Sequence, residues 1–320
     1  MRIALDAMGS DRAPAIEVEG AVGALLSLGG DFKLVFVGDT PLIEAELARF
    51  PEAPRERIEM GESPAQAIRR TPDSSIVVGL NLHKQREVDA FISAGSTGAV
   101  MAGSLVLLRP LAGVDRPPVG TVLPRRDGQF LLLDAGANVD TRPQHLVQFA
   151  HLGTIYARNL MGIEEPRVGL LNIGEEPEKG DERALEAHRL LAASASLRFV
   201  GNIEGRDLIE DHCDVVVCDG FVGNVILKFY ESVAPFIIGL FRREIEAAQA
   251  RVDVSKIIRV LDYTEYGGAP LLGVNGVTII CHGGSPPRAV RNAIRVAVQA
   301  VESHMVADIE TRLAALKPNP

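Results

Sequence analysis

The chain is short of cysteine, of net positive charge and of long apolar runs, and each shortage excludes something. Its three cysteines are odd in number and lack CxxC spacing, which is typical of reduced thiols in a cytosolic protein. No run of about 18 uninterrupted apolar residues occurs, which predicts that nothing spans a membrane. The opening residues, MRIALDAMGSDRAP, carry charges too early for a secretory signal. A net charge of −9 argues against nucleic acid as a partner.

Several sequence signatures of known chemistry are also missing. Neither a G-x-x-x-x-G-K-[ST] loop nor a G-x-G-x-x-G turn occurs, so no nucleotide-binding fingerprint is supported. Ser96 lies in AGSTG and therefore lacks the G-x-S-x-G spacing of a nucleophile elbow. Asp207 and Asp211 are four residues apart, as metal ligands on one helical face would be, but a solvated face is the better interpretation. The sequence therefore predicts no metal site.

Apolar runs that predict strands alternate with helical patterns along the chain. The strands are expected at Ile3–Asp6, Leu34–Val37, Ala90–Ser93, Leu131–Asp134, Val168–Asn172, Val215–Cys218 and Val277–Cys281. The helices are expected near 14–28, 40–49, 64–85, 97–108, 143–160, 181–193, 221–250 and 286–316. This alternation predicts an α/β fold with a largely parallel sheet covered on both faces. The length permits two lobes, and Pro117–Pro118 and the Arg125–Gly128 turn are candidate lobe boundaries.

The most informative stretch is DVVVCDGFVGNVILK, residues 214–228. A buried strand ends near Cys218 and a helix is under way by Val225, so the turn between them lies at the carboxyl end of a strand. In open α/β sheets, ligands bind at that end. Glycine lets the backbone approach a ligand closely, and free N–H groups at a helix start favour an anion. The residues that this turn presents are Asp219, Gly220, Gly223, Asn224 and Lys228.

Four further polar loops follow predicted strands. They are SAGSTG at 93–98, DAGAN at 134–138, NIGEE at 172–176 with Lys179 just beyond, and CHGGS at 281–285. Any one of them is ordinary turn chemistry, but a turn needs no Asn, Lys or His beside its glycines. Of the seven histidines, only His282 lies in such a loop. The five loops together predict an enzyme with a cleft for a substrate that bears phosphate.

The same motifs resemble those of the PlsX family of bacterial phosphate acyltransferases. The resemblance runs nearly end to end, through IALDAMGSDRAP (3–14), SAGSTGA (93–99), LDAGANVD (133–140), LVQFAHLG (146–153), LLNIGEEPEKG (170–180), VCDGFVGNVILK (217–228) and EYGGAPLLGVNG (265–276). The chain departs from the family at Ser10, where the family usually has Gly, and at Ser96, where it usually has Asn. Both replacements are small and polar, so the loops are expected to survive.

The resemblance implies a fold and a reaction. The fold would be a three-layer α/β/α sandwich like those of phosphotransacetylases and of isocitrate and isopropylmalate dehydrogenases, with 1–320 forming one two-lobed catalytic domain. The site would lie between the lobes of a homodimer. The enzyme would convert fatty acyl-acyl carrier protein and inorganic phosphate into acyl phosphate, without a cofactor. Acyl phosphate would then supply a membrane glycerol-3-phosphate acyltransferase in phospholipid synthesis. The protein would be cytoplasmic and peripherally bound to the membrane.

Residue roles follow from placing this chemistry on the matching motifs. A thioester with a leaving thiol of pKa about 8.5 is already activated and phosphate is already a nucleophile, so no covalent intermediate is needed. Asn224 is expected to donate a hydrogen bond to the oxyanion or the phosphate. Asp219 would orient Lys179 or Lys228, and Asn138 and His282 are further catalytic candidates. Lys179 is also assigned as catalytic, as a point charge for phosphate. Phosphate and substrate contacts are assigned to Gly95, Ser96, Thr97, Gly98, Asn172, Gly220, Gly223 and Lys228.

Two other functions remain open from the sequence. One is a phosphotransacetylase that uses short acyl-CoA, which a preference for CoA over carrier-protein thioesters would select. The other is a decarboxylating dehydrogenase that uses NAD and a metal on the same fold. The absence of a convincing cluster of aspartates argues against the second function.

A protruding helical segment is expected at approximately 229–262. Its residues Val254, Ile257, Ile258 and Leu261 recur at helical spacing and form one apolar stripe. Arg242 and Arg243 lie upstream. The stripe could bind a membrane surface or pack on the core or on a dimer partner. The arginines could bind anionic lipid or the acidic carrier protein.

Replacing Ile257 and Leu261 with Asp tests the membrane interpretation of this stripe. Burying four such side chains in a bilayer interface contributes on the order of 4–8 kcal/mol, enough to hold a protein without a spanning helix. The double variant should therefore no longer sediment with anionic vesicles, while its activity on a soluble carrier-protein substrate persists. A lower melting temperature or a broken dimer would instead indicate packing of the stripe within the protein.

Overall fold

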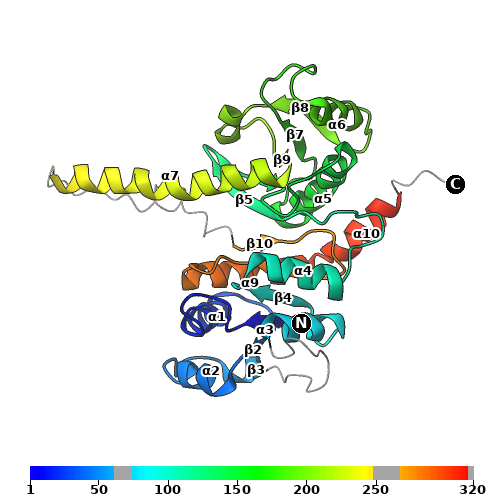
Figure 1. The fold of residues 1–320 in the computed structure, drawn as a ribbon. Coiled ribbons are helices and arrows are strands. Elements are labelled where there is room, and N and C mark those ends of the chain that lie inside the picture. Colours follow the sequence, from blue (N-terminus) through cyan, green and yellow to red (C-terminus); the bar gives the residue numbers. More distant parts are fainter. Residues whose placement is uncertain (61–73, 248–266, 316–320) are drawn as a thin grey trace. The chain divides into compact units, whose positions relative to one another are not determined.

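The chain forms two compact units in a computed structural model that describes residues 1–60, 74–247 and 267–315. Unit 1 comprises Met1–Val119, Ile155–Ile163 and Tyr266–Pro320, and unit 2 comprises Gly120–Thr154 and Glu164–Glu265. The first boundary follows directly after the proline pair at 117–118. Figure 1 shows the helices and strands of each unit.

Unit 1 is built on a six-stranded sheet in the order β10-β11-β4-β1-β2-β3. Neighbouring strands are parallel except for β10 and β11. Since β11, β4 and β1 are parallel neighbours, their carboxyl ends meet at one edge of the sheet. The strands are β1 (Arg2–Asp6), β2 (Lys33–Val37), β3 (Ile58–Met60), β4 (Ala90–Ser93), β10 (Ala269–Pro270) and β11 (Val277–Ile280).

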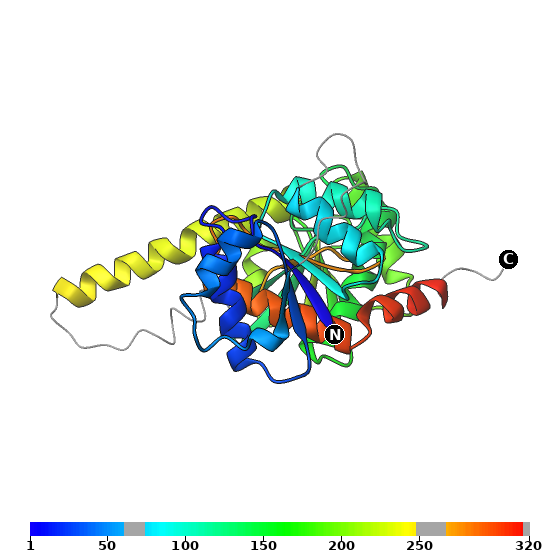
Figure 2. The same ribbon diagram turned by 90° about the horizontal axis from the view of Figure 1, so that it is seen from below.

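Helices cover both faces of this sheet (Figure 2). On one face α3 (Ser75–Lys84) packs with α4 (Thr97–Leu107), and on the other α9 (Pro287–Glu302) packs with α1 (Ala15–Ser27). Both α3 and α9 contact the central strands β1 and β4. The unit also contains α2 (Thr40–Leu47), the 3-10 turn η1 (Arg55–Arg57), α10 (Met305–Ala315) and the last part of α5.

The prediction of a single helix at 286–316 is wrong, because the chain breaks the helix near the middle of that range. The chain forms two helices there, because α9 ends at Glu302 and α10 begins at Met305. His304, between them, has a φ of 52°. That left-handed conformation cannot continue a right-handed helix.

Unit 2 is built on a five-stranded sheet in the order β5-β6-β9-β7-β8. β5 and β6 form an antiparallel hairpin, and the other neighbouring pairs are parallel. The carboxyl ends of β6, β9 and β7 therefore lie next to one another. The strands are β5 (Gly120–Arg125), β6 (Gly128–Leu133), β7 (Arg167–Leu171), β8 (Arg198–Ile203) and β9 (Val215–Val217). The helices are α5 (Pro143–Met161), α6 (Glu182–Ala192), the 3-10 turn η2 (Gly205–Ile209) and α7 (Gly220–Ala247).

The helix α7 is long, apolar and largely exposed. Its first half packs Ile226, Leu227 and Tyr230 onto a buried cluster of the unit 2 sheet. Beyond that contact the helix extends past the other elements of its unit (Figure 1). Gly220–Ile245 is long and apolar enough to cross a membrane by length and composition, although only 11% of its most apolar window is buried. The sequence predicts a helix near 221–250 but not a candidate membrane span, because Lys228 and Glu231 interrupt its apolar run.

A cluster of two arginines and two aspartates joins strands of the unit 2 sheet at the edge opposite the carboxyl ends of β6, β9 and β7. Arg167, at the start of β7, contacts both Asp211 and Asp214, and Arg125 contacts the same two carboxylates. Arg125 also donates to the Cys213 carbonyl at 2.6 Å. Asp207 accepts from the Glu204 amide in η2 instead. Asp207 and Asp211 are thus held separately, Asp207 by a backbone amide and by Arg206 and Asp211 by Arg125 and Arg167.

Replacing Asp214 with Asn should destabilise unit 2 by about 3–5 kcal/mol, because it leaves the nearly buried Arg125 guanidinium without its buried partner. Burial raises the pKa of Asp214, but the hydrogen bonds and charge of Arg167 outweigh it, so the pKa is lowered overall. The stabilisation is therefore complete above the unfolded pKa of about 3.9 and is lost as pH falls below it. Urea unfolding at pH 7 and pH 3 measures this. Glu210→Gln, in a more exposed ion pair with Arg126, is the control and should cost about 0–1 kcal/mol.

Candidate functional site

The polar loops predicted from the sequence follow strands, and they divide between the two units. The predicted loops after β4 and β11 lie together in unit 1, beside the loop after β1, and the predicted loops after β6, β7 and β9 lie together in unit 2. Each set is at the carboxyl edge of a parallel sheet, where α/β enzymes bind ligands. The prediction of polar loops at strand ends is therefore confirmed for each sheet.

In unit 1 the loop after β4 starts a helix. Ser96 is the N-cap of α4, and its hydroxyl accepts from the Ala99 amide at 3.4 Å. Ser96, Thr97 and Gly98 are exposed. The first amides of α4 therefore lie at an exposed helix start, which suits an anion.

This loop is anchored by a buried carboxylate. Ser93 donates its hydroxyl to Asp6 at 2.6 Å and accepts from the Gly95 amide at 3.0 Å. The other carboxylate oxygen of Asp6 accepts from the Met8 amide at 3.0 Å. Asp6 and Ser93 are fully buried, so they order the loop from below and do not contact solvent.

His282 lies in the loop after β11, and its side chain is exposed. Its Nδ1 accepts from the Gly284 amide at 3.1 Å, and its own amide donates to the Ser285 hydroxyl at 3.1 Å. Because Nδ1 is an acceptor, the proton of the neutral ring is on Nε2. His282 can therefore offer a donor to a ligand from a well-ordered loop.

In unit 2 the loop after β6 is closed by Asp134, a fully buried residue. Its carboxylate accepts from the amides of Gly136, Ala137 and Asn138, and from the Asn138 side chain at 2.8 Å. Asn138 is itself nearly buried, and its carbonyl accepts from the Gly220 amide at 2.8 Å. The side-chain amide of Asn138 thus orders this loop, and its backbone carbonyl joins the loop to the one after β9.

The start of α7 is capped by Asp219. One carboxylate oxygen accepts from the amides of Phe221 and Val222 at 2.9 and 3.0 Å. The other accepts from Arg183 at 3.0 Å. The expectation that Asp219 orients Lys179 or Lys228 is wrong, because Arg183 occupies that place and Lys228 pairs with Glu231 at 2.7 Å. Lys228 is an exposed helical lysine held by a local ion pair.

Gly223 shows how closely the two loops of unit 2 approach. A Cβ at this position would lie 1.8 Å from the Asp134 carbonyl oxygen, so no other residue fits there. One residue further on, the exposed side chain of Asn224 lies against Gly136. It has no hydrogen-bond partner among residues 1–60, 74–247 and 267–315, which leaves its amide available to a ligand.

The loop after β7 presents Lys179. Asn172 uses both ends of its amide inside this loop, donating to the Lys179 carbonyl at 2.9 Å and accepting from the Ile173 amide at 2.9 Å. The aliphatic part of Lys179 packs over Gly174. Within the part of the chain that the structure describes, its Nζ has no hydrogen bond or ion pair. Asn172 therefore positions a cation that remains available.

The cysteines are poor nucleophiles. Burial raises the pKa of Cys213 and of Cys281 to about 12, and it raises that of Cys218 as well. All three thiols are free of disulfides and buried. At neutral pH they are protonated, so they are unsuited to covalent catalysis.

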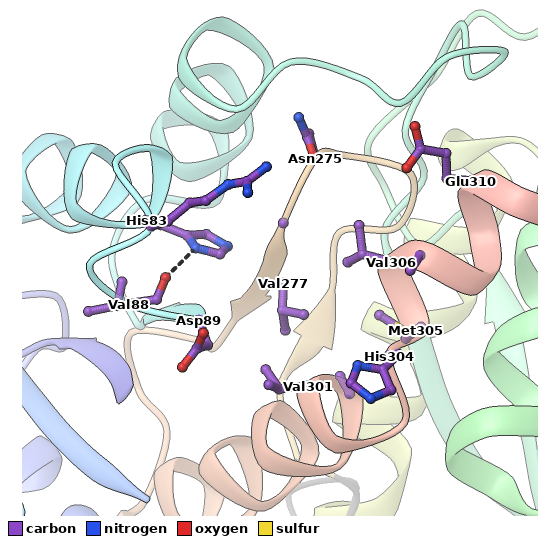
Figure 3. Close-up of a pocket in the computed structure, with 14 residues that line it drawn as sticks. His83, Val88, Asp89, Asn275, Val277, Val301, His304, Met305, Val306 and Glu310 are labelled. Carbon is purple, nitrogen blue, oxygen red and sulfur yellow. Dashed lines mark hydrogen bonds between the residues drawn. The ribbon is translucent and has the colours of Figure 1, made fainter. Parts of the chain in front are cut away.

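A cavity also lies outside these loops. It has a volume of about 450 Å³ in unit 1 and lies where β4 and β11 begin, at the edge opposite the polar loops (Figure 3). His83, which lines it, donates from Nδ1 to the Val88 carbonyl at 3.0 Å, and burial lowers its pKa. None of the predicted site residues lines this cavity. No group of three or more His, Cys, Asp or Glu residues suited to a metal occurs in the described ranges.

The predicted residues are thus distributed over both units. Unit 1 gathers Gly95, Ser96, Thr97, Gly98 and His282, and unit 2 gathers Asn138, Asn172, Lys179, Asp219, Gly220, Gly223 and Asn224. Lys228 stands apart, and Arg242 and Arg243 are exposed further along α7. Val254, Ile257, Ile258 and Leu261 lie outside the described residues.

Sequence reasoning missed the anchoring residues Asp6, Ser93 and Arg183. Asp6 had a signal, because it is the last residue of a predicted strand within the motif IALDAMG. Arg183 had none. It lies in the first turn of a helix, and only the fold brings it to Asp219.

Comparison with known proteins gives a consistent result. Residues 1–308 match the family described as "Fatty acid synthesis protein". A phosphate acyltransferase of Desulforamulus reducens is 48% identical over 328 aligned positions, covering 98% of this chain and 97% of that protein. One of Heliobacterium modesticaldum is 47% identical and covers 98% of both.

Solved structures share the fold at low identity. A phosphotransacetylase of Streptococcus pyogenes is 16% identical with a TM-score of 0.64 and covers 94% of both chains. A 4-hydroxythreonine-4-phosphate dehydrogenase of Klebsiella pneumoniae is 13% identical with a TM-score of 0.54, covering 94% of this chain and 99% of the other. These likenesses confirm the predicted layered α/β fold of the phosphotransacetylase type.

Replacing Arg183 with Met should loosen the start of α7, since it leaves the buried Asp219 carboxylate without its cation. Because Arg183 is about one-third exposed, we expect a loss of only about 1–2 kcal/mol in urea unfolding. Hydrogen exchange at the Phe221 and Val222 amides should accelerate. Arg189→Met is the matched control, because Arg189 lies on the same helix and is itself exposed, and its ion pair in the described part of the chain is with the partly exposed Glu186. Equal stability of the two variants would contradict the anchoring role of Arg183.

Proposed function

We propose that this chain, which belongs to the fatty acid synthesis protein family and is a phosphate acyltransferase, forms acyl phosphate from fatty acyl-acyl carrier protein and inorganic phosphate. The curated relatives named above carry the phosphate acyltransferase name over nearly their whole length. That name does not specify the acyl donor or the use of the product. We propose acyl carrier protein as the donor and glycerol 3-phosphate acylation as the step that uses acyl phosphate.

The observation that carries the proposal is the Nζ of Lys179, which no residue in the described part of the chain pairs with, in a strand-end loop whose backbone Asn172 holds at the Lys179 carbonyl. A cation without a carboxylate partner suits a phosphate or a developing oxyanion. Within the same unit, Asn224 offers a side-chain amide that no described residue uses. The exposed helix start at Ser96 and Thr97 in unit 1 supplies backbone donors of the kind that bind phosphate.

The proposed reaction uses these groups without covalent catalysis. A phosphate oxygen attacks the thioester carbonyl carbon, and the carbonyl oxygen becomes an oxyanion. The C–S bond then breaks, the sulfur leaves and takes up a proton, and the new C–O bond joins acyl group and phosphate. Lys179 and Asn224 would stabilise the charge that develops, where one donor contributes about 3 kcal/mol. The protonated, buried cysteines support a direct attack.

A second candidate is transfer between short acyl-CoA and phosphate. The fold of the phosphotransacetylases is shared, as described for the protein of Streptococcus pyogenes, but at an identity too low to carry a substrate. The two functions differ in the thiol that leaves. A dehydrogenase that needs a metal is less well supported, because the described residues contain no acidic cluster for it.

We place the protein in the cytoplasm, peripherally bound to a membrane, as a homodimer, where a membrane glycerol-3-phosphate acyltransferase would take its product. The supporting feature is the described part of α7, where Phe229, Phe236 and Leu240 are large, apolar and exposed. Beside them Arg242 and Arg243 are exposed cations that suit anionic lipid or the acidic carrier protein.

The function is tested by mixing the purified chain with acyl-acyl carrier protein and phosphate and measuring free thiol and acyl phosphate. The same acyl group is offered on CoA in a parallel reaction. We expect both products to form faster from the carrier-protein thioester. A clear preference for short acyl-CoA would select the phosphotransacetylase function instead, and no acyl phosphate from either donor would exclude both.

Lys179→Ala and Asn224→Ala should each lower thiol release by about a hundredfold or more without unfolding the protein, since each removes a group that stabilises developing charge. Rising phosphate should partly restore Lys179→Ala if Lys179 mainly binds phosphate. Lys228→Ala is the matched control, because its ammonium group is held by Glu231. Near-normal turnover of a folded Lys179 or Asn224 variant would remove that residue from the site.

A further inference from the structure

Glu17, on α1, is a buried carboxylate with an unusual set of partners. It is fully buried, and both of its oxygens accept from one residue, the Ser10 amide at 2.8 Å and the Ser10 hydroxyl at 3.0 Å. Among residues 1–60, 74–247 and 267–315, no Lys or Arg pairs with it. Burial of an unpaired carboxylate opposes folding, so its presence calls for a role besides stability.

Ser10 belongs to a loop that joins the other polar loops of unit 1. Its neighbour Gly9 lies so close to the β4 loop that a Cβ there would be 2.6 Å from the Gly95 amide nitrogen. On its other side, the Asp11 amide donates to the Gly283 carbonyl at 3.0 Å. A shift of Ser10 would therefore disturb both the loop that carries Ser96 and the loop that carries His282.

Ser10 supplies both of the hydrogen bonds that the Glu17 carboxylate accepts. Glycine at this place could offer the carboxylate only its amide, whereas serine adds a hydroxyl, so that each oxygen of Glu17 has a donor. Ser10 is itself nearly buried, so its hydroxyl is held by Glu17 and is not displayed to a substrate.

We propose that Glu17 is a positioning residue, which holds residues 8–11 through Ser10 and thereby sets the phosphate-binding helix start of unit 1. The expected effect of Glu17 on catalysis rests on the proposed function. The ordering of the loop by Glu17 is independent of that function. Within the described ranges, the side-chain hydrogen bonds of Glu17 go to Ser10, which is not assigned to the substrate, so Glu17 acts through Ser10.

The direction of the pKa shift of Glu17 distinguishes a positioning role from a role in stability alone. Burial raises that pKa and the charge of Asp6 raises it further, against the hydrogen bonds from Ser10, which lower it. Cys281 is the other titratable group that interacts with Glu17, and its thiol is protonated at neutral pH. A raised pKa means that ionisation of Glu17 opposes folding, so stability falls as pH rises through the folded pKa. Removing the negative charge of Glu17 should therefore stabilise the fold. Removing its acceptor oxygens should instead disorder residues 8–11 and weaken phosphate binding.

Two substitutions at Glu17 test this separation. Glu17→Gln keeps one acceptor for the Ser10 amide and one donor for its hydroxyl, so the KM for phosphate should stay within about threefold of the unchanged protein. Its melting temperature at pH 8 should not fall. Glu17→Leu leaves Ser10 unpaired, so the KM for phosphate should rise about tenfold or more, with the KM for the acyl thioester unchanged. Glu19→Gln, an exposed glutamate on the same helix, is the control.

Hydrogen exchange of residues 8–11 and 94–97 is measured on the same proteins. Faster exchange in Glu17→Leu, together with normal exchange in Glu17→Gln, supports the inference whether or not acyl phosphate is formed. Unchanged exchange and an unchanged KM for phosphate in Glu17→Leu would overturn it. If Glu17→Leu does not fold, Ser10→Ala, which removes only the hydroxyl, must itself accelerate exchange of the loop, and normal exchange there would equally overturn it. Failure of the unchanged protein to form acyl phosphate would instead refute the proposed function alone.

Discussion

The candidate site depends on one repeated interaction, in which a buried carboxylate at the end of a parallel strand accepts hydrogen bonds that order the loop beyond it. Asp6 does this after β1, Asp134 after β6 and Asp219 after β9. Amides that leave a strand lose their ladder partners, and a carboxylate can satisfy several of them at once. The loops can therefore be short, polar and ordered without a cofactor to organise them.

This arrangement separates residues that build the site from residues that are left for a ligand. Asn138, Asn172 and Asn224 all lie in glycine-containing loops after strands, so the sequence does not distinguish them. The side-chain amides of Asn138 and Asn172 donate hydrogen bonds to groups of their own loops. Asn224 and Lys179 have no such partner in the described part of the chain. A polar residue in a strand-end loop is thus informative about binding only once its own hydrogen bonds are known.

Close backbone approach adds a second constraint. Gly223 lies against the Asp134 carbonyl and the Gly220 amide donates to the Asn138 carbonyl, so the loops after β6 and β9 are interlocked. Arg183 extends the connection from Asp219 to Thr141 and Asp181. Small changes in one loop of unit 2 would consequently be transmitted to the others, which explains why several of these positions admit only small or specific side chains.

The sequence by itself determined the α/β class, seven of the strands, the loops that follow them and the family motifs. These features depend on local patterns, because apolar runs and glycine-rich turns report on strands and their ends within a few residues. It did not identify β3, β5, β8 and β10, which are short or partly exposed strands and therefore lack a continuous apolar run. It also could not place the break at His304, which only a backbone angle reveals.

Only the tertiary structure decided which residues of the site are engaged. Arg183 meets Asp219 across 36 residues of sequence, and Ser93 meets Asp6 across 87. Glu17 and Ser10 are seven residues apart, but their pairing depends on how the loop before α1 turns back over the helix. Residue type predicts what a side chain is able to bind. Which partner it binds depends on the sheet order, because the order of the strands decides which loops become neighbours.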